Sequence, residues 1–366
     1  MNPQGPPSHG WEVKGPSAPF PYIPGFSVKI RPYTPPTETQ TQADAEESLK
    51  PRYPSGIRDI SAVEYCIVKP YFELETGLFP EAGHLAREHI LRVDSITTRP
   101  ASDVWWNVVQ CQLDDDRKSR YTAKIYDPVY SSDVMFAHMH ANDHINNEAD
   151  AYSRVRDAGI PGRVTPVFLG VWVMDVPVPS KSFGGVDYAT TRPVPLLLFE
   201  EVEAANLAST YLQNYYTSGY VESQPQLPRA WRQEVLAKIY EAKALLCHAG
   251  VYAPVSMDGV LVGTSVLEDG RLDVRVFITD FEQARIADPE ECTGETPERP
   301  VSPIETYWDK VMHSASWLAK DEWAEDVRGY RQWLVQRWGE STEYRPLSEE
   351  LRKRIADGKW EEMSRS

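Results

Sequence analysis

The sequence lacks both long apolar runs and an excess of basic residues. No stretch of 18 apolar residues occurs, so no segment is expected to cross a bilayer as a helix. The 366 residues include 38 Lys and Arg against 54 Asp and Glu, which gives a formal net charge of −16 at pH 7. Because nucleic acids and anionic membrane surfaces bind clustered basic side chains, neither is an expected partner.

Cysteine is also scarce. The four cysteines are far apart and form no CxxC pair, which argues against a disulfide framework and a zinc knuckle and favours reduced thiols. Residues 1–7 do not show the basic-then-apolar pattern of a secretory signal. We therefore expect a soluble, cytoplasmic protein. The cysteines are Cys66, Cys111, Cys247 and Cys292.

The N-terminal part of the chain has little apolar periodicity. Residues 1–58 are rich in Pro, Ser, Thr, Gln and Gly, which is typical of loop or disorder, and we expect a largely unstructured extension. The aromatic residues within 19–28 leave an alternative open, an extended strand that packs on the folded domain. Residues 59–88 are interpreted as a second extension without chemistry, with helical spacing over 82–91.

The remainder shows two kinds of periodicity, strands over 89–202 and mainly helices over 203–366. β-Branched and aromatic residues predict strands over 90–93, 104–113, 121–126, 167–173, 195–202, 260–262 and 276–278. Helical spacing predicts helices over 146–155, which an Asn cap opens, over 229–248, in two or three segments beyond Pro303, and over a capped final segment within 345–351.

Several short motifs follow one another in a recognisable order. A strand carries Lys124, a helix carries Glu148, a further strand ends in acids, and a long helix precedes two strands and the pair Asp280-Phe281. The stretches concerned are 123–128, 147–152, 196–200, 248–251, 278–281, 302–308 and 344–351. In order and spacing they resemble the protein-kinase-like proteins of filamentous fungi, single-domain relatives of aminoglycoside phosphotransferases, over about residues 88–350.

The resemblance implies a fold and a set of roles. The fold is α+β and two-lobed, with an antiparallel sheet and one helix in the N-lobe (89–202) and a helical C-lobe (203–366). Lys124 matches the lysine that holds nucleotide phosphates, and Glu148 matches its partner. Asp280 matches the aspartate that binds magnesium.

The chain departs from the family where chemistry is needed. When the HxDxxxxN pattern is aligned on 250–252, Ala253 stands at the His, Val255 at the Asp base and Val260 at the metal-binding Asn. An isopropyl group neither accepts a proton nor coordinates a hard cation. The segment 95–103, expected to cover phosphates, contains no glycine. The sequence therefore predicts a degenerate, pseudokinase-type member without phosphotransfer.

Each retained residue has two interpretations. Lys124 and Glu148 form a structural ion pair, or Lys124 is a donor that polarises a carbonyl of a ligand. Asp280 holds a metal weakly, or caps the following turn or pairs with Lys124. Asp258 is interpreted as a turn residue rather than a displaced base. His248 is placed at a helix C-terminus, where the dipole suits an imidazolium.

A histidine-rich segment is the remaining metal candidate. His140 and His144 are four residues apart, a spacing that suits one face of a helix, and His138 lies nearby. No HExxH glutamate accompanies them, and the resemblance places this region in a variable loop. No metal and no cofactor are therefore expected.

These observations lead to two functional hypotheses. In the first, the interlobe cleft binds and cyclises a small terpenoid- or polyketide-like substrate in fungal specialised metabolism, by a cofactor-free intramolecular cycloaddition with Lys124, Glu148 and Asp280 as catalytic residues. In the second, the chain is a non-catalytic scaffold or nucleotide sensor that binds a partner protein. The predicted pocket-lining residues are Trp106, Phe199, Glu200, Val255, Met257, Val260 and Phe281.

Overall fold

The chain divides into two compact units. The structure is a computed structural model, and the residues that it describes are 12–14, 21–33, 59–61, 87–97, 106–114, 116, 118–130, 134–177, 182–183, 186–187, 191–209, 228–270, 272–288, 298–310, 323, 326–358 and 360. Unit 1 comprises Met1–Asp150 and Val167–Glu201, and unit 2 comprises Ala151–Pro166 and Val202–Ser366.

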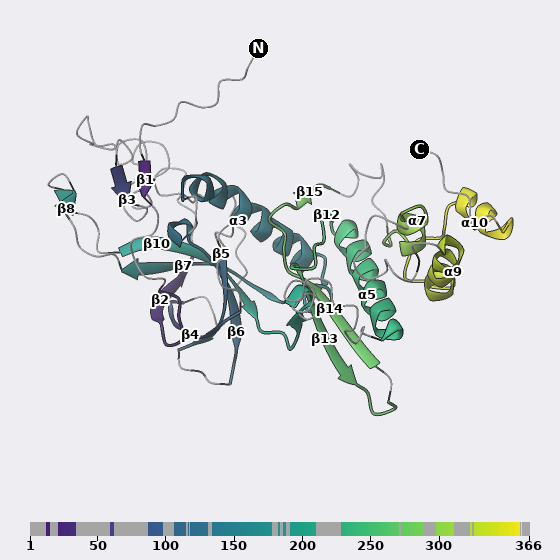
Figure 1. Cartoon of the computed structure of the whole chain (residues 1–366), viewed down its shortest axis with the longest axis horizontal. Coiled ribbons are helices and arrows are strands. Elements are labelled where there is room, and N and C mark those ends of the chain that lie inside the picture. Colours follow the sequence, from purple (N-terminus) through teal and green to yellow (C-terminus); the bar gives the residue numbers. More distant parts are fainter. Residues whose placement is uncertain are drawn as a thin grey trace, which may run out of the picture. The chain divides into compact units, whose positions relative to one another are not determined.

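Unit 1 contains a closed antiparallel β-barrel (Figure 1). Its strands follow one another around the barrel in the order β10-β6-β5-β4-β2-β7. Strands predicted near 90–93, 104–113, 121–126, 167–173 and 195–202 are present, and closure pairs the outer strands of the set, so none of the six is left as an edge. The strands are β2 (Ser27–Pro32), β4 (His89–Ile96), β5 (Trp106–Leu113), β6 (Tyr121–Tyr126), β7 (Phe168–Pro177) and β10 (Thr191–Glu200).

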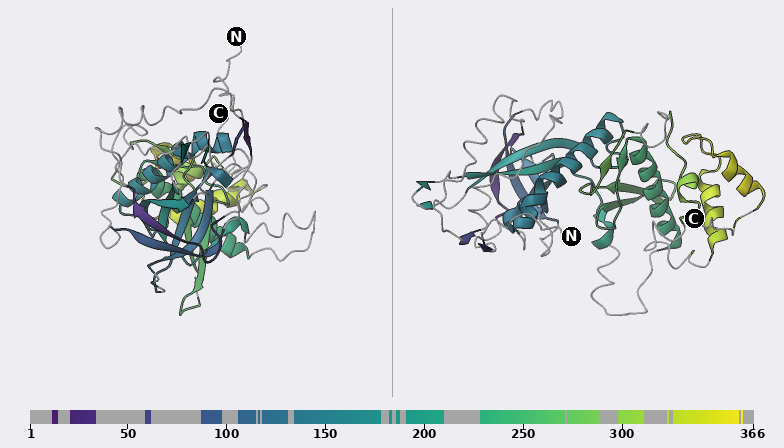
Figure 2. Two further views of the ribbon diagram at one scale, coloured as in Figure 1. Left: turned by 90° about the vertical axis from the view of Figure 1, so that its left-hand side faces the viewer. Right: turned by 90° about the horizontal axis from the view of Figure 1, so that it is seen from above.

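The barrel core follows from the alternation of side chains along the strands. In β5, Asn107, Val109, Cys111 and Leu113 are buried, whereas the residues between them are half-buried. A strand with this period of two directs one set of side chains inward and the other set outward. Each large apolar side chain that is buried in this way stabilises the fold by about 1.5–3 kcal/mol. The views in Figure 2 show the strands curving around this core.

Strand β2 comes from the N-terminal segment that the composition assigns mainly to loop or disorder. It pairs with β4 on one side and with β7 on the other, and Tyr22, just before it, is fully buried. The structure therefore has the alternative left open by the sequence, an extended strand packed on the domain. The N-lobe boundary that the sequence indicates at residue 89 therefore leaves out β2, although β2 closes the barrel. Short pairs also occur between β1 (Glu12–Lys14) and β3 (Asp59–Ser61), and between β8 (Ser182–Phe183) and β9 (Val186–Asp187).

Helix α3 (Val134–Asp157) is longer than the sequence pattern predicts. The expected Asn cap near 146 is wrong, because the helix begins twelve residues earlier and residue 146 lies in its interior. The segment with His140 and His144 is therefore helical and not a loop. The helix ends before Gly159, whose φ of 70° is unfavourable for a residue with a Cβ.

Unit 2 combines a small sheet with helices (Figure 1). The predicted helix over 229–248 is α5 (Arg229–His248), which packs on strand β14. The predicted final helix is α10, and its N-cap Ser348 accepts a hydrogen bond from the N–H of Leu351. The other elements are β11 (Ala205–Asn206), β12 (Val251–Tyr252), β13 (Val260–Val266), β14 (Leu272–Ile278), β15 (Arg285–Ile286), α7 (Pro303–Tyr307), α9 (Val327–Trp338) and α10 (Glu349–Ala356).

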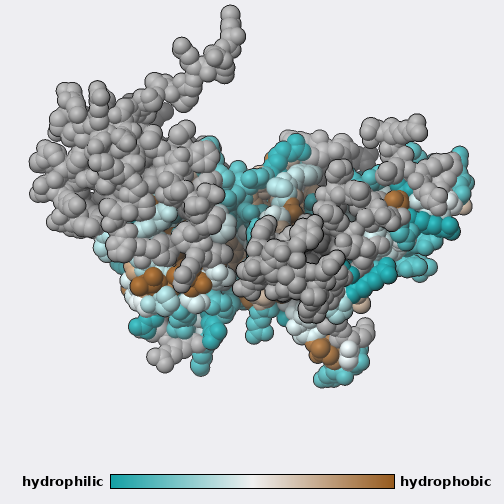
Figure 3. Space-filling view, viewed as in Figure 1, coloured by the Kyte–Doolittle hydropathy of each residue, from teal (hydrophilic) through white to brown (hydrophobic). Residues whose placement is uncertain are grey.

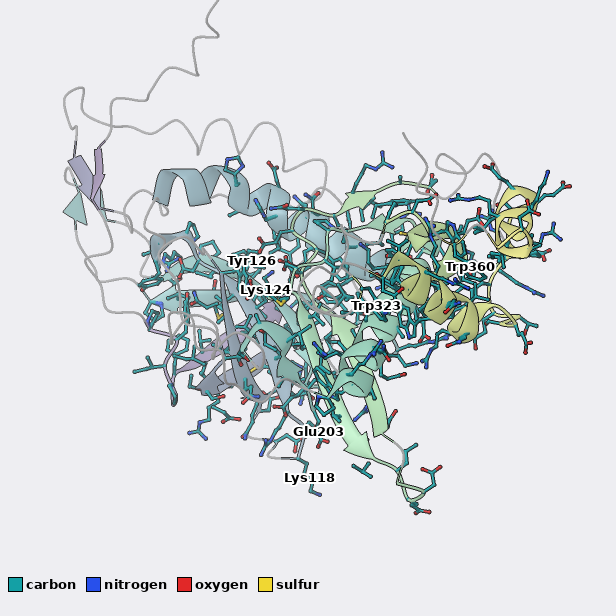
Figure 4. The ribbon with its side chains drawn as sticks, turned by 45° about the vertical axis from the view of Figure 1, so that its right-hand side comes forward. Lys118, Lys124, Tyr126, Glu203, Trp323 and Trp360 are labelled. Atoms are coloured by element: carbon teal, nitrogen blue, oxygen red, sulfur yellow. The ribbon has the colours of Figure 1, made fainter. Side chains whose placement is uncertain are left out.

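Aromatic side chains hold the helices of unit 2 together. The ring of Tyr240 on α5 stacks on Tyr307, with the ring centroids 3.7 Å apart. The hydroxyls of Tyr240 and Tyr330 are hydrogen-bonded at 3.0 Å, which joins α5 to α9. Arg331 is fully buried and donates to the backbone carbonyl of Trp360 at 2.7 Å. Trp360 is labelled in Figure 4. The rings of Tyr240 and Tyr330 are thus buried while their hydroxyl groups stay hydrogen-bonded to each other.

The face of the molecule seen in Figure 3 is largely polar in its described parts, with hydrophobic colours confined to small areas. Among the helices of the described residues, none is both long and apolar enough to cross a membrane. The apolar side chains that the sequence offers are therefore used mainly in the two cores.

Candidate functional site

A buried ion pair lies on the outer face of the barrel in unit 1. The Nζ of Lys124 on β6 is 2.7 Å from Oε2 of Glu148 on α3. Lys124 is 5% exposed and Glu148 is fully buried. The structure thus brings together Lys124 and Glu148, which the sequence predicts to be catalytic.

Two aromatic residues complete this arrangement, which we call the Lys124 centre: Trp106, Lys124, Tyr126 and Glu148. Tyr126 donates its hydroxyl hydrogen to the Oε2 of Glu148 that Lys124 also contacts. The ammonium of Lys124 lies 4.3 Å from the ring centroid of Trp106 and 5.4 Å from that of Tyr126. Figure 4 shows Lys124 and Tyr126 side by side.

The strand register explains why these side chains meet. Trp106 on β5 is paired with Tyr126 on β6, and Val108 is paired with Lys124. Side chains at alternate positions share a face, so Trp106, Lys124 and Tyr126 all lie on the face opposite the barrel core. Glu148 reaches the same face from α3. The sequence motif indicated the Lys–Glu pair, but the place of Trp106 beside Lys124 depends on the cross-strand register.

The electrostatics of the Lys124 centre depend on all of its members. An ionised group buried without a partner is very unfavourable, and removal of one member of a buried pair costs about 3–5 kcal/mol. An ammonium over an aromatic ring gains a further ~0.5–2 kcal/mol. The centre therefore holds a buried ion pair, with its ammonium fixed against an aromatic surface.

A second buried charge pair begins one residue beyond Tyr126. Both carboxylate oxygens of Asp127 accept from the guanidinium of Arg192, with Nη1 to Oδ1 at 2.8 Å. Tyr22 donates its hydroxyl to Oδ2, and the N–H of Val129 donates to Oδ1 at 3.2 Å. Asp127 is fully buried and Arg192 is 3% exposed. Sequence reasoning missed this group, because Tyr22 and Asp127 are 105 positions apart and Asp127 and Arg192 are 65 positions apart.

In unit 2, the segment aligned with a kinase catalytic loop contributes one valine to the core and its aspartate to a turn. Val260 is fully buried and pairs with Ile278 across β13 and β14. Val255 and Met257 are half-buried. Asp258 is exposed in a turn, and its carbonyl accepts from Nδ2 of Asn206 at 2.7 Å. The prediction that Asp258 is a turn residue is therefore confirmed.

The Asp280-Phe281 pair serves the local structure of unit 2. Oδ1 of Asp280 accepts from the N–H of Glu282 at 3.4 Å, as in a side chain that caps the following turn. Phe281 is fully buried, and its ring meets that of Tyr152 edge-on with centroids 4.9 Å apart. The Tyr152 hydroxyl donates to the carbonyl of Thr279 at 3.0 Å. This geometry favours the capping interpretation of Asp280.

The predicted pocket-lining residues are divided between the units. In unit 1, Trp106 belongs to the Lys124 centre, Phe199 is buried against Phe168, and Glu200 is exposed at the end of β10. Val255, Met257, Val260 and Phe281 belong to unit 2. A pocket that these residues share stays a prediction.

His248 lies in the last turn of α5, as the sequence predicts. Burial, and then Arg345, lower the pKa of His248 from its ordinary value, which opposes an imidazolium at this helix end. The rings of His140 and His144 meet edge-on, 6.2 Å apart. Within the described ranges, no group of three metal-binding side chains includes either of them.

Other predictions fall outside the described residues. These are the glycine-free stretch over 98–103, the helical spacing over 82–86, the side chain of His138, and Cys66 and Cys292. Cys111 and Cys247 take part in no disulfide, and burial, followed by Asp94 and Glu201, raises the pKa of Cys111 well above its ordinary value.

Comparison with known proteins gives only distant similarities. No family model and no curated protein matches the chain. A structure described as "ROP18 kinase domain in complex with AMP-PNP and sucrose" has a TM-score of 0.34 and 18% identity, over 55% of this chain and 54% of that one. A second, "Crystal structure of a Stt7 homolog from Micromonas algae soaked with ATP", has a TM-score of 0.33 and 14% identity, over 52% and 50%. The chain thus spans about half the length of each.

At these TM-scores, neither similarity indicates a function for this chain. The protein contains both helices and strands and is therefore α+β. The assignment to a protein-kinase-like family therefore depends on the motifs in the sequence.

Proposed function

We propose that this chain is a kinase-like protein that does not transfer phosphate and that binds a small organic ligand at the Lys124 centre. One contrast carries the proposal. The pair of Lys124 and Glu148 is assembled and buried, whereas the segment 253–260 has valines at the positions of the general base and of the metal-binding amide. The retained lysine and glutamate suit binding and polarisation, and the base and the amide are missing.

The loss of phosphotransfer follows from side-chain chemistry. A general base must reach the proton that it removes, and a magnesium ion requires oxygen ligands. Asp258 is the one carboxylate within 253–260, and it lies in a turn whose backbone is held by Asn206. Val260 takes the position of the expected amide and is part of the core. Val260 therefore supplies no oxygen to a metal ion, and we assign Asp258 to the turn.

The Lys124 centre favours a particular class of ligand. A fixed ammonium beside the rings of Trp106 and Tyr126 attracts a planar, conjugated molecule that carries a carbonyl or an anionic group. Polarisation of such a carbonyl, together with a fixed orientation, is sufficient to promote an intramolecular cycloaddition. That reaction transfers no atoms to or from a cofactor. The proposed substrate is terpenoid- or polyketide-like, as in fungal specialised metabolism.

A second candidate function is supported by the burial of the same residues. Lys124 is 5% exposed, and Glu148, Trp106 and Tyr126 all contact it, as a purely structural ion pair would require. In that case the chain is a non-catalytic scaffold or nucleotide sensor that binds a partner protein. The Lys124 centre then stabilises the barrel and has no ligand.

The test uses 1-anilinonaphthalene-8-sulfonate, a planar aromatic anion, as a fluorescent probe. We expect it to bind the wild-type chain and to bind Lys124→Met at least about tenfold more weakly, which corresponds to 1.4 kcal/mol. The matched control is Lys118→Met, since Lys118 is exposed and Figure 4 shows it away from Lys124. Equal binding by both variants contradicts a ligand site at Lys124.

Two further measurements separate the alternatives. Incubation with γ-labelled ATP and Mg²⁺ should transfer no phosphate to generic protein or aminoglycoside acceptors. Robust transfer that Lys124→Met abolishes contradicts the whole proposal. An increase in the unfolding midpoint with ATP and Mg²⁺, without probe binding, favours the nucleotide sensor.

A further inference from the structure

The N-terminal segment is anchored to the barrel by a buried carboxylate. Asp127, at the end of β6, receives the hydroxyl of Tyr22 and the two nitrogens of the Arg192 fork. Tyr22 and Asp127 are fully buried and Arg192 is 3% exposed. Charge-assisted bonds in such a site are strong and directional. The segment around Tyr22 is therefore held at one defined position on β6.

Backbone hydrogen bonds and ring contacts hold the same segment. Gly25 donates to the carbonyl of Val93 at 2.8 Å, and Val93 donates to that of Phe26 at 2.9 Å. The ring of Tyr22 meets those of Phe26 and Tyr130 edge-on, at 5.5 Å and 6.1 Å. Burial, and then Asp127, raise the pKa of Tyr130 to about 12, so the Tyr130 hydroxyl stays protonated at neutral pH. The Tyr22 hydroxyl thus points from a well-packed ring to Asp127.

The anchored residue is the direct neighbour of a member of the Lys124 centre. Asp127 follows Tyr126, and the Tyr126 hydroxyl bonds to the carboxylate that also holds Lys124. Movement of the backbone at Asp127 therefore moves the Cα of Tyr126 directly. A hydroxyl-to-carboxylate bond is sensitive to displacements of a few tenths of an ångström.

We propose that Tyr22 is a positioning residue for the Lys124 centre, acting through Asp127 and Tyr126 on the carboxylate of Glu148. The N-terminal segment then closes the barrel and also sets the orientation of the Lys124 ammonium. Arg192 shares this role, because it fixes the other side of the Asp127 carboxylate. The inference concerns the geometry of the centre and goes beyond the proposed ligand, since it holds whether or not a ligand binds.

The test measures how accessible the Lys124 amine is in the full chain. Reductive methylation with formaldehyde and a borane reductant labels amines, and mass spectrometry gives the labelling rate of Lys124 relative to exposed Lys118. Tyr22→Phe removes only the hydroxyl, and Arg192→Lys keeps the charge but loses the fork. We expect either change to raise this ratio between about twofold and about thirtyfold, the range of measured couplings between sites.

Two controls distinguish positioning from a general loss of stability. Tyr121→Phe removes a hydroxyl from β6, the strand that precedes Asp127, but this hydroxyl does not contact Asp127. The variant should leave the labelling ratio of Lys124 to Lys118 unchanged. Alkylation of the Cys111 thiol, fully buried in the barrel, reports opening of the barrel itself. The proposal is overturned if the Lys124 ratio stays constant in Tyr22→Phe and Arg192→Lys, whatever their unfolding midpoints. It is equally overturned if alkylation of Cys111 rises in proportion to labelling of Lys124.

Discussion

At the scale of single residues, the immediate contacts of each side chain determine whether it takes part in an ion pair, packs in a core or stabilises a turn. Lys124 and Glu148 neutralise each other in a buried position, while Val260, aligned with a metal ligand, is packed into a sheet. Asp258 and Asp280 each serve a turn. Asp258 and Asp280 therefore contribute to local structure, and the Lys124 centre keeps an ion pair beside the rings of Trp106 and Tyr126.

A first residue-scale prediction concerns acid stability. Burial opposes the charge of Asp114, but the N–H of Ile90 and the ring of His89, 2.6 Å away, outweigh it, so the pKa of Asp114 lies below 3.8. A lowered carboxyl pKa stabilises the fold above the unfolded-state value, and this stabilisation is lost as the pH falls through the folded-state pKa. We expect the difference in unfolding free energy between wild type and Asp114→Asn to shrink below about pH 4.

Urea titrations at intervals from pH 6 to pH 2.5 measure this difference. Asparagine suits the comparison because Asp114 has a φ of 54°, a conformation that Asn tolerates better than most residues. A difference that stays constant over this pH range would contradict the prediction.

A second residue-scale prediction concerns the lost metal position. Restoring the amide with Val260→Asn should lower the unfolding free energy by about 1–3 kcal/mol, because a polar group enters the core without a hydrogen-bond partner. Val266→Asn, on the same strand but 71% exposed, is the matched control and should cost no more than ~0.5 kcal/mol. Denaturant unfolding of both variants gives the comparison. Equal costs would show that Val260 does not belong to the core.

At the scale of elements, strand β2 distinguishes the observed closed barrel from the antiparallel sheet that the resemblance to kinase-like proteins predicts. β2 pairs with both β4 and β7, and without it both would present unpaired backbone groups. The buried anchor at Asp127 places the same segment against β6 and β10. The N-terminal segment is therefore part of the folded unit and not an appendage to it.

Removal of this strand should be costly. A variant that lacks residues 1–33 should unfold at least about 5 °C lower than the full chain and aggregate more readily, because two strand edges open and Asp127 loses a donor. A variant that lacks residues 1–11 keeps every described element and serves as the control. Calorimetry or fluorescence-monitored melting measures both. Identical midpoints for the two truncations would mean that β2 does not contribute to closure.

At the scale of the whole molecule, charge and burial set the general properties. The formal net charge is −16, and the large apolar side chains are mainly in the cores of the two units. Excess negative charge keeps a protein soluble but disfavours the compact state through self-repulsion. This property follows from composition and does not depend on the details of either unit.

The self-repulsion predicts a salt dependence with a defined pH limit. At pH 7, raising NaCl from about 0.02 M to about 0.5 M should raise the unfolding midpoint, because the screening length falls below about 10 Å. Near pH 5.0, the isoelectric point of the sequence, the same increase should have little effect. Thermal melts at the two pH values make the comparison. A salt effect of equal size at both would point to specific ion binding instead.

How much of the protein could be predicted from its sequence depended on the distance between the interacting residues. Strand β6 and helix α5 were predicted with the bounds that the structure shows, since each has a clear local period. Helix α3 was predicted too short, because its first turns carry histidines and asparagines that do not form an apolar stripe. The Lys–Glu pair was accessible through its motif, whereas the place of Trp106 beside Lys124 required the register between β5 and β6.

The sequence by itself determined the alternation of strands and helices, the negative charge and the loss of polar groups at Val255 and Val260, because these depend on composition and on neighbours along the chain. Only the tertiary structure decided that an N-terminal strand closes the barrel and that Tyr22 meets Asp127, 105 positions away. Such contacts arise when the folding of distant segments into one core compensates for the entropy of closing a long loop, and no local pattern encodes that balance.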